Sequence, residues 1–251
     1  MAGTTVRGRL SWRVAKVAAA VDETPGVRSL VLDCPGWPGH LPGQHVDVRL
    51  TAEDGYQAQR SYSIATPADG TRLTLTIERI ADGEVSPYLA DELRPGDGLE
   101  LRGPIGGWFV WEPALGGPLQ LVGGGSGVVP LMAMLRARAA AGADIPARLL
   151  LSARSWDEVI YRDELERLGA GGGLEVRFAL TRAQPPGWTG YARRIDHDML
   201  GEVAWSPEEM PRSFVCGPTG LVEAATRALV ELGHDPATVK AERFGPTGGP
   251  G

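Results

Sequence analysis

A short polar run, Arg60-Ser61-Tyr62-Ser63, combines residue types that can hold a charged, aromatic ligand. On an extended strand, Arg60 and Tyr62 point to the same face and lie about 7 Å apart. A guanidinium binds phosphate and a phenol ring packs on a flat ring, so this wall suits a ligand that has both. The alternative is an exposed strand face with ordinary polar residues, which an isolated run of this kind more often is.

A second run, Gly83-Glu84-Val85-Ser86, leads from a strand into a helix expected over residues 87–93. A helix N-terminus offers unpaired N–H groups and the positive end of its dipole, and these groups together bind anions. The run therefore indicates a diphosphate site. Taken alone, a glycine followed by a serine before a helix is more often a turn with an N-cap serine.

A third run, Gly123-Gly124-Gly125-Ser126-Gly127, lies between an apolar strand and an expected helix. Consecutive glycines let the backbone approach a pyrophosphate closely, and the helix N-terminus stabilises its charge. The spacing departs from GxGxxG, so the run does not match the dinucleotide fingerprint of ordinary dehydrogenases. Tight strand-to-helix turns use glycine anyway, which makes this run a weak indication by itself.

Two further segments follow expected strands of the same half. Cys216-Gly217-Pro218 falls at the carboxyl edge of a sheet, where open α/β folds bind ligands, although a lone cysteine there is by default a small core residue. Thr181-Arg182 follows another strand, and Arg154 follows the one before it. Arginine is the residue that binds the 2′-phosphate of NADP(H), so these positions favour NADPH and leave NADH open.

The elements that must position these residues divide the chain into two halves. Up to about residue 110 the pattern has period two and predicts a six-stranded antiparallel barrel. Residues 112–118 are rich in proline and glycine and break the pattern, so domains are expected over 1–113 and 118–251. Strands of the barrel are expected over 9–21, 27–32, 45–50, 59–64, 73–79 and 98–102.

After the linker, strands alternate with helices, which predicts a five-stranded parallel, doubly wound sheet. The expected strands are 119–122, 148–152, 174–180, 213–216 and 238–242. The expected helices are 128–141, 158–168, 196–200 and 221–232.

Bulk composition excludes several classes of protein. A net charge of −6 over 251 residues argues against a nucleic-acid partner, which would need clustered Lys and Arg. Two distant cysteines, Cys34 and Cys216, cannot form a disulfide framework or ligate an iron–sulfur cluster, and the four histidines lack metal-ligand spacing, so no metal site is expected. Without a signal peptide or an apolar run of about 18 residues, we expect a cytoplasmic location and no membrane insertion.

Taken together, and with Pro42-Gly43-Gln44 and Gly103-Pro104-Ile105-Gly106, these motifs resemble the ferredoxin–NADP⁺ reductase superfamily over nearly the whole chain. The resemblance implies an FAD-binding barrel followed by an NAD(P)-binding sheet. It implies that Arg60 pairs with the FAD pyrophosphate, that Tyr62 packs on the isoalloxazine, and that Ser63 lies near flavin N5. Strict alternation puts Ser63 on the face opposite Tyr62, so this contact requires the strand to end or bend there.

The same resemblance implies roles for the other motifs. Cys216 would lie close to the nicotinamide C4 and Glu242 near the flavin, so the catalytic set would be Ser63, Cys216 and Glu242. Phe244 would shield the flavin face, although the chain continues beyond it to Gly251. The remaining cofactor-binding positions are Ile77, Arg79, Gly83, Val85 and Ser86 for FAD, and Gly124, Gly125, Ser126, Gly127, Arg154, Thr181, Arg182, Cys216 and Gly217 for NAD(P).

The function implied is an FAD-dependent oxidation of NADPH or NADH, with electrons passed singly to a separate ferredoxin or oxygenase component. Two alternatives remain: a reductase of free flavin or ferric complexes, and a non-catalytic flavin electron-transfer subunit. FMN in place of FAD also stays open.

Overall fold

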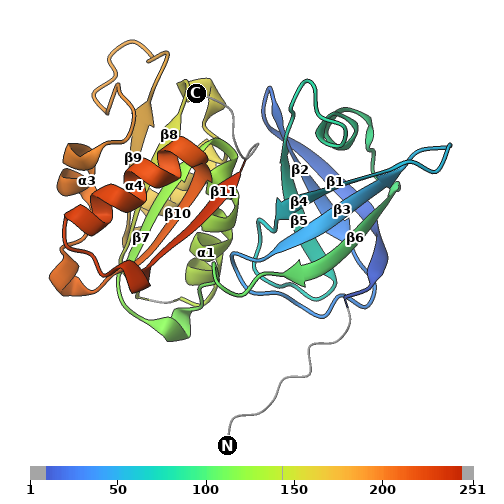
Figure 1. Cartoon of the computed structure of the whole chain (residues 1–251), viewed down its shortest axis with the longest axis horizontal. Helices are drawn as coiled ribbons and strands as arrows, with labels where there is room; N and C mark the ends of the chain where they lie inside the picture. Colours follow the sequence, from blue (N-terminus) through green and yellow to red (C-terminus); the bar gives the residue numbers. More distant parts are fainter. Residues whose placement is uncertain (1–9, 143, 245–251) are drawn as a thin grey trace, which may run out of the picture.

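The N-terminal half of the chain forms a closed antiparallel barrel. The structure is a computed structural model that describes residues 10–142 and 144–244 (Figure 1). Strand order in this sheet is β4-β3-β6-β1-β2-β5, and a bridge between Ile64 and Leu75 joins the two edges. The strands are β1 (Trp12–Thr24), β2 (Val27–Asp33), β3 (His45–Thr51), β4 (Gln57–Ser63), β5 (Arg72–Glu78) and β6 (Gly98–Ile105).

Alternating burial explains why these segments form strands. On β5, Leu73, Leu75 and Ile77 are at most 1% exposed and belong to the barrel core, while Arg72 at the start of the strand is exposed. Burying one face of each strand supplies the apolar core that stabilises the barrel. All paired neighbours are antiparallel, so the predicted six-stranded barrel is confirmed.

Two strands, β1 and β6, end later than the sequence predicts. β1 continues to Thr24, and its pairing with β2 shifts register twice. Such bulges bend a strand without ending it, which keeps the turn-like residues 22–24 in the sheet. β6 extends to Ile105, where it pairs with His45 at the start of β3.

The short helix predicted over 87–93 is a single π-helical turn, Tyr88–Glu92. Leu89 and Leu93 are fully buried in the barrel core, and Val85, just before the turn, is buried with them. Leu93 takes an extended conformation and ends the turn after five residues. The turn therefore anchors the preceding loop, 83–86, on the barrel.

The C-terminal half is the predicted five-stranded parallel sheet, in the order β11-β10-β7-β8-β9. Sequence order reverses between β7 and β10, and open α/β sheets bind ligands at such a reversal. The strands are β7 (Leu119–Gly124), β8 (Ala147–Ala153), β9 (Leu174–Leu180), β10 (Arg212–Pro218) and β11 (Val239–Phe244).

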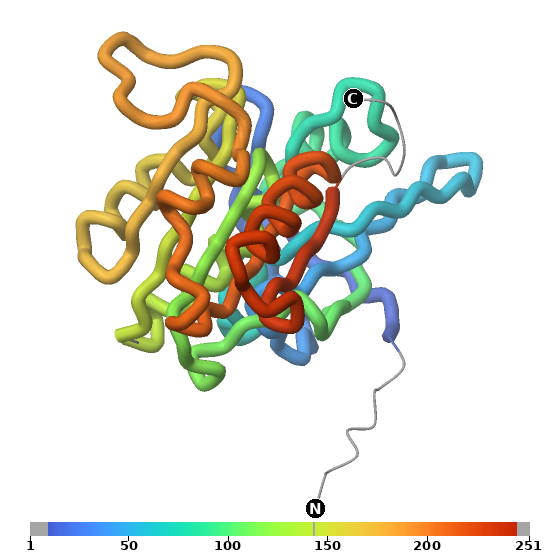
Figure 2. The backbone as a smooth tube through the Cα atoms, turned by 60° about the vertical axis from the view of Figure 1, so that its left-hand side comes forward, coloured from blue at the N-terminus to red at the C-terminus, as the bar shows by residue number. Residues whose placement is uncertain are grey.

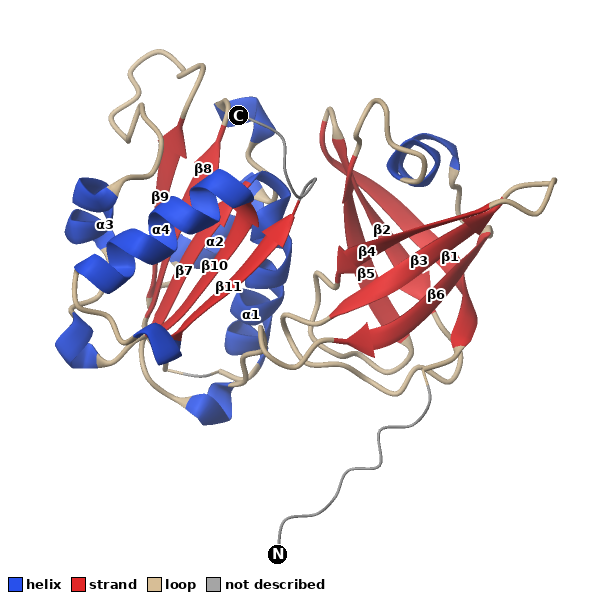
Figure 3. Cartoon of the chain, viewed as in Figure 1, coloured by secondary structure: helices blue, strands red, loops and turns tan. Residues whose placement is uncertain are grey.

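Helices cover both faces of this sheet (Figure 3). One apolar cluster contains residues of α1 (Val128–Ala140) and α2 (Arg162–Ala170), and a second contains residues of α3 (His197–Val203) and α4 (Thr219–Glu231). Residues of β7 and β10 contribute alternately to the two clusters, as period-two strands must when both faces are covered.

One predicted helix, 158–168, begins later than expected. Residues Trp156–Glu158 form a separate helical turn, and α2 starts only at Arg162. Tyr161 lies between them with φ 59°, a left-handed conformation that a right-handed helix cannot contain. The apolar residues 159–161, which the prediction placed in the helix, are instead buried in the core between the two helical segments.

α1 lies between the parallel sheet and the barrel (Figures 1 and 3). Every residue from Val128 to Leu135 is buried, so the first two turns of the helix are apolar on all sides rather than on one stripe. The cluster that contains α1 also includes Val27 and Ala65 from the barrel half. β11 is the strand of the parallel sheet on the side of the barrel in Figure 1, and in the turned view of Figure 2 the parallel-sheet half lies in front of the barrel. One apolar cluster thus includes residues of both halves, while the barrel also has a separate core of its own.

The connection between the halves holds a short helical turn, Pro113–Leu115, and then enters β7. The domain limits 1–113 and 118–251 stay a prediction, and the residues at both chain ends lie outside the described part. No helix among the residues that the structure describes has both the length and the apolar character needed to cross a membrane.

We expect Leu75→Ala to lower the free energy of unfolding by about 2–5 kcal/mol, because it removes a fully buried side chain and leaves a cavity. Urea denaturation followed by circular dichroism measures this change. Leu10→Ala is the control, since Leu10 is 48% exposed and its truncation should change stability little. Equal effects of the two substitutions would contradict the assigned core.

Candidate functional site

The glycine turn after β7 lies against strand β5 of the barrel. A Cβ placed on Gly125 would lie 3.9 Å from Glu78 Oε2, with no other atom closer. Gly125 has φ +54°, which suits glycine, and the space beside it is otherwise open. The two predicted cofactor regions therefore face each other across the domain boundary.

Arg60 lies on β4 with its guanidinium at the surface. Nη2 donates to Glu84 Oε2 at 2.6 Å, and Nη1 donates to the Gln59 carbonyl at 2.7 Å. Tyr56 donates to the other Glu84 oxygen at 2.8 Å. Arg60 thus lies beside the predicted diphosphate loop, as expected, and its charge is balanced there by an acidic residue of the same loop.

Tyr62 and Ser63 occupy the end of β4, on opposite sides of the strand. Burial raises the pKa of Tyr62 to about 12, so the phenol stays neutral. Ser63 is 6% exposed, and its Oγ has no hydrogen-bond partner within the described residues. Since β4 ends at Ser63, the strand end that a flavin contact would require is present.

The loop 83–86 provides backbone donors. Gly83 donates its N–H to the Ile80 carbonyl, whereas the N–H groups of Val85 and Ser86 have no acceptor in the described part of the chain. Ser86 Oγ accepts the Ile80 N–H at 3.0 Å and keeps its own hydrogen for another acceptor. Two N–H groups and one hydroxyl can therefore bind an anion here, and Gly83 does not add its own N–H.

Ile77 and Arg79, two residues predicted to contact FAD, have side chains that are already engaged within the protein. Ile77 points into the barrel core, so only its backbone is available to a ligand. Arg79 is exposed and donates to Asp91 at 2.6 Å. Both roles stay predictions.

The glycine turn is packed tightly against Cys216-Gly217. A Cβ on Gly127 would collide with the Cys216 carbonyl oxygen, and a Cβ on Gly217 would lie 3.1 Å from the Gly124 backbone. Gly124 and Gly127 are buried for this reason, while Gly125 and Ser126 remain partly open. Gly124 and Gly127 therefore allow the close contact with β10, whereas Gly125 and Ser126 remain accessible to a ligand.

Cys216 and Glu242 are register partners on β10 and β11. Burial raises the pKa of the Cys216 thiol well above its usual value, and the Glu242 carboxylate raises it further. The group is therefore a neutral thiol at pH 7 and not a thiolate nucleophile. This state agrees with a role in shaping the nicotinamide pocket.

Glu242 also faces the barrel. Its Oε1 lies 3.9 Å from His45 Nδ1, and its buried Oε2 has no partner among the described residues. Burial raises the pKa of Glu242 to about 7 and lowers the pKa of His45. His45 is also the register partner of Ser63 across β3 and β4, so His45 connects the end of β4 in the barrel with Glu242 of the parallel sheet.

Sequence reasoning missed His45, although it directly follows the Pro42-Gly43-Gln44 motif. A single histidine at the start of a strand has no spacing partner, so only the fold brings it to Glu242. Phe244 packs against the apolar cluster that contains Cys216. Its predicted flavin-shielding role stays a prediction.

Arg154 and Arg182 are brought together at the carboxyl ends of β8 and β9. The Arg182 N–H donates to the Arg154 carbonyl at 2.9 Å, and Thr181 donates its N–H and Oγ to Ala153. Arg154 has one loose ion pair with Glu158 at 3.8 Å, and Arg182 has no ion pair in the described chain. Both arginines are exposed and lie on hydrogen-bonded segments, and an arginine side chain can bind a phosphate group.

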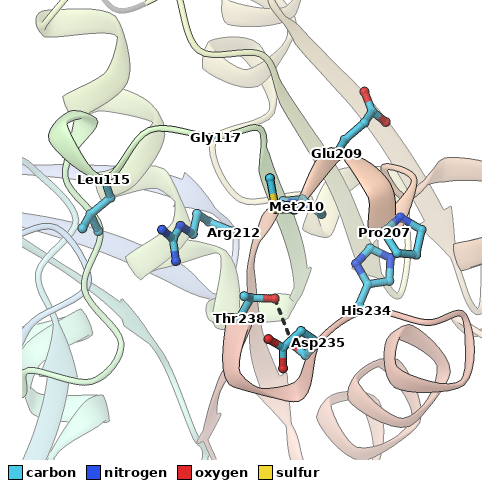
Figure 4. A pocket seen from close by; sticks show the side chains of 10 residues that line it. Leu115, Gly117, Pro207, Glu209, Met210, Arg212, His234, Asp235 and Thr238 are labelled. Atoms are coloured by element: carbon cyan, nitrogen blue, oxygen red, sulfur yellow. Dashed lines mark hydrogen bonds between the residues drawn. The ribbon is translucent and has the colours of Figure 1, made fainter.

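A cavity of about 370 Å³ lies elsewhere, lined by residues that include Leu115, Met210, Arg212, His234 and Thr238 (Figure 4). Arg212 begins β10 and Thr238 precedes β11, so this cavity is at the amino ends of these strands. The predicted cofactor residues lie at the carboxyl ends. The cavity is therefore separate from the candidate site.

Comparison with known proteins agrees with this geometry. Residues 16–110 match the family model for an oxidoreductase FAD-binding domain, and residues 121–227 match that for an oxidoreductase NAD-binding domain. Ferredoxin–NADP reductase B of Sorangium cellulosum is 35% identical over 239 residues, covering 92% of this chain and 96% of that protein. The chain belongs to the ferredoxin–NADP reductase superfamily. FAD and NAD(P) are therefore the cofactors of this reductase, and it is a flavin-dependent NAD(P)H oxidoreductase.

Other relatives share the reductase's two-domain plan. The glycine betaine monooxygenase reductase subunit of Pseudomonas aeruginosa is 32% identical over 97% of this chain, which spans 66% of that subunit. Among solved structures, the FAD/NAD-binding domain of nitric oxide dioxygenase from Vibrio cholerae has a TM-score of 0.83 at 26% identity, covering 93% of this chain and 99% of that one.

The residues of the reductase fit both cofactors. On the flavin side, Ser63 Oγ and Glu242 Oε2 are buried polar atoms without a partner in residues 10–142 and 144–244, and a bound polar ring would satisfy them. The free N–H groups of Val85 and Ser86 suit a pyrophosphate. On the other side, the open space at Gly125 admits the backbone contact that a dinucleotide needs.

We expect Glu242→Gln to stabilise the protein at pH 8 but not at pH 4. A carboxyl whose folded pKa is raised stabilises the fold fully below its unfolded value and loses this contribution as pH rises through about 7. The neutral amide avoids that loss, so we expect a gain of about 2 kcal/mol at pH 8 relative to pH 4. Urea unfolding at the two pH values measures it.

The control for this substitution is Glu231→Gln on α4, an exposed residue that should give no pH-dependent difference. A Glu242→Gln variant whose stability relative to the parent is the same at both pH values would contradict the raised pKa of the Glu242 carboxyl.

Proposed function

We propose that the protein oxidises NADPH, uses NADH less well, and passes electrons singly to a separate redox protein. The observation that carries this proposal is the approach of Glu242 on the parallel sheet to His45 of the barrel, with Cys216 and Ser63 as the strand register partners of these two residues. When bound, FAD accepts a hydride and releases single electrons. The residues of the chain provide binding, orientation and control of protons.

On the barrel side, the roles follow from charge and hydrogen bonding. Arg60 would neutralise the FAD pyrophosphate, and the Val85 and Ser86 N–H groups would donate to it. Tyr62, kept neutral by burial, would form an apolar wall for the flat ring. Ser63 would donate its hydroxyl hydrogen to a flavin ring nitrogen, since the described chain offers it no other acceptor.

On the sheet side, the glycine turn would hold the dinucleotide diphosphate while the Cys216 thiol limits the space beside the nicotinamide. Arg154 and Arg182 would bind the 2′-phosphate that only NADPH carries. Glu242, with a pKa near neutrality, would hold or release a proton between the two cofactor sites. These roles support NADPH as the preferred donor.

The electron acceptor is proposed to be a ferredoxin or an oxygenase component. Support comes from the relatives, one a ferredoxin–NADP reductase and another the reductase subunit of a monooxygenase. With only two cysteines, this sequence cannot bind a four-cysteine iron–sulfur cluster of its own. The acceptor's identity and a cytoplasmic location stay predictions.

A second candidate function is the reduction of free flavin or ferric complexes. Glu84 favours it, because this carboxylate lies in the diphosphate loop and already occupies Arg60 at 2.6 Å. A negative charge there opposes a bound pyrophosphate, which would make the flavin easier to exchange. Purified protein with stoichiometric FAD would favour the first function over this one.

We expect Arg60→Ala to weaken FAD binding roughly ten- to hundredfold, because it removes charge-assisted hydrogen bonds to the pyrophosphate. Titration of flavin fluorescence measures the dissociation constant. Arg72→Ala, at an exposed position at the start of β5, is the matched control and should bind FAD normally. If Arg60→Ala retains a full complement of FAD, the assigned role of Arg60 is wrong.

We expect NADPH to bleach the flavin absorption faster than NADH under anaerobic conditions. Arg182→Ala should reduce this preference roughly tenfold, because it removes one of two guanidiniums for the 2′-phosphate. Stopped-flow absorbance with each nucleotide measures both quantities, and Arg227→Ala on the exposed side of α4 is the control. If Arg182→Ala prefers NADPH over NADH as strongly as the parent does, the assignment of Arg182 to the 2′-phosphate is wrong.

A further inference from the structure

A chain of hydroxyl groups joins the two halves of the protein. Tyr161, which precedes α2, is 3% exposed and hydrogen-bonded through its hydroxyl to Thr76 Oγ1 on β5. Thr76 Oγ1 lies 2.8 Å from Ser29 Oγ on β2, and Ser29 donates to Glu23 Oε1 at 2.6 Å. Each hydroxyl has one hydrogen, so the carboxylate end fixes the direction of the chain. Tyr161 is therefore the donor to Thr76.

Arg136 on α1 makes a second connection beside the first. Its Nε and Nη2 donate to both oxygens of Glu164 on α2, at 2.9 and 2.6 Å. Its Nη1 donates to the Ala65 carbonyl of the barrel half at 2.7 Å, and its guanidinium lies 4.8 Å from the centre of the Tyr161 ring. One side chain thus ties α1, α2 and the segment after β4 together.

The backbone at Tyr161 is adapted to this contact. A left-handed conformation in a bulky non-glycine residue costs about 1–3 kcal/mol and persists only where surrounding contacts require it. Here it separates α2 from the preceding turn while the ring is buried beside Arg136 and the hydroxyl meets Thr76. Burial also raises the pKa of Tyr161 to about 12, so the hydroxyl keeps its hydrogen at any physiological pH.

The two connections lie next to the elements that carry the proposed cofactor contacts. Thr76 precedes Ile77 on β5, and Ala65 lies two residues beyond Ser63. Arg136 belongs to α1, which begins directly after the glycine turn. The links therefore hold the flavin-side strands at a fixed position relative to the helix that presents the nicotinamide nucleotide.

We propose that Tyr161 and Arg136 are positioning residues that set the separation between the flavin and nicotinamide rings. This inference rests on the proposed function. Neither residue is among the groups assigned to bind a cofactor, so their effect is on the geometry between two sites. A displacement of about 1 Å between reacting groups can cost about a hundredfold in rate. Loss of either connection should therefore slow hydride transfer without weakening the binding of either cofactor.

The test is Tyr161→Phe in the full-length chain, because phenylalanine keeps the ring and its packing and removes only the hydroxyl. We expect single-turnover hydride transfer from NADPH to slow roughly tenfold or more, with dissociation constants for FAD and NADP⁺ within about twofold of the parent. Tyr191→Phe is the matched control, since Tyr191 donates to Glu202 at 2.7 Å within the C-terminal half. It should match the parent in all three measurements.

A readout without cofactors comes from calorimetry of the cofactor-free protein. We expect the parent to unfold in one transition, because the halves share a core, and Tyr161→Phe to separate or broaden it. Arg136→Lys and Thr76→Val provide second variants: lysine keeps the charge without the planar fork, and valine removes the Thr76 hydroxyl from the barrel side. Both should slow hydride transfer as Tyr161→Phe does, so the inference can be tested even if one variant does not fold.

The outcomes separate this inference from the proposed function. If the parent protein's flavin is bleached by neither nucleotide, the proposed function fails and the inference fails with it. If the parent is bleached but Tyr161→Phe transfers hydride at the parent rate, only the inference is overturned. A fall in cofactor affinity that accounts for the slower rate also overturns it, because Tyr161 would then act on binding.

Discussion

The close approach of two chain turns at the reversal of the parallel sheet is the constraint on which the site depends. After β7 the backbone passes so near to Cys216 and Gly217 that neither Gly127 nor Gly217 has room for a side chain. This contact brings the glycine turn and the Cys216 thiol to one edge of the sheet, and β11 adds Glu242 beside them. Backbone packing therefore fixes the positions of the turn and of the strand ends that carry the proposed nicotinamide contacts.

Most of the architecture follows from periodicity in the sequence. Period-two alternation gave the barrel, and the strand–helix alternation gave the parallel sheet, because burial of one or two faces dictates each pattern. The start of α2 could not be predicted in this way. The backbone of Tyr161 is left-handed, which delays the helix to the next residue, and the residue types at 159–161 do not reveal that conformation. The register shifts between β1 and β2 were not predicted either, because bulges leave no clear signal in a single sequence.

Parts of the candidate site were visible in the sequence for a different reason. Arg60, the 83–86 loop and the glycine turn are contiguous motifs whose chemistry can be read locally. His45 and the buried carboxyl of Glu242 could not be, because their environment comes from residues far apart in the chain. Arg154 and Arg182 were predicted together for the 2′-phosphate, but the backbone hydrogen bond that joins their segments at the ends of β8 and β9 could not be predicted from the sequence.

α1 has a consequence for the two halves as separate units. Its residues from Val128 to Leu135 are all buried, and barrel residues Val27 and Ala65 cover part of the same cluster. If the C-terminal half were separated at the linker, the apolar surface of this cluster would be exposed to water and the fragment would tend to self-associate. Replacing one half with the corresponding domain of another oxidoreductase would thus require either that both halves be transferred together or that the apolar interface between them be redesigned.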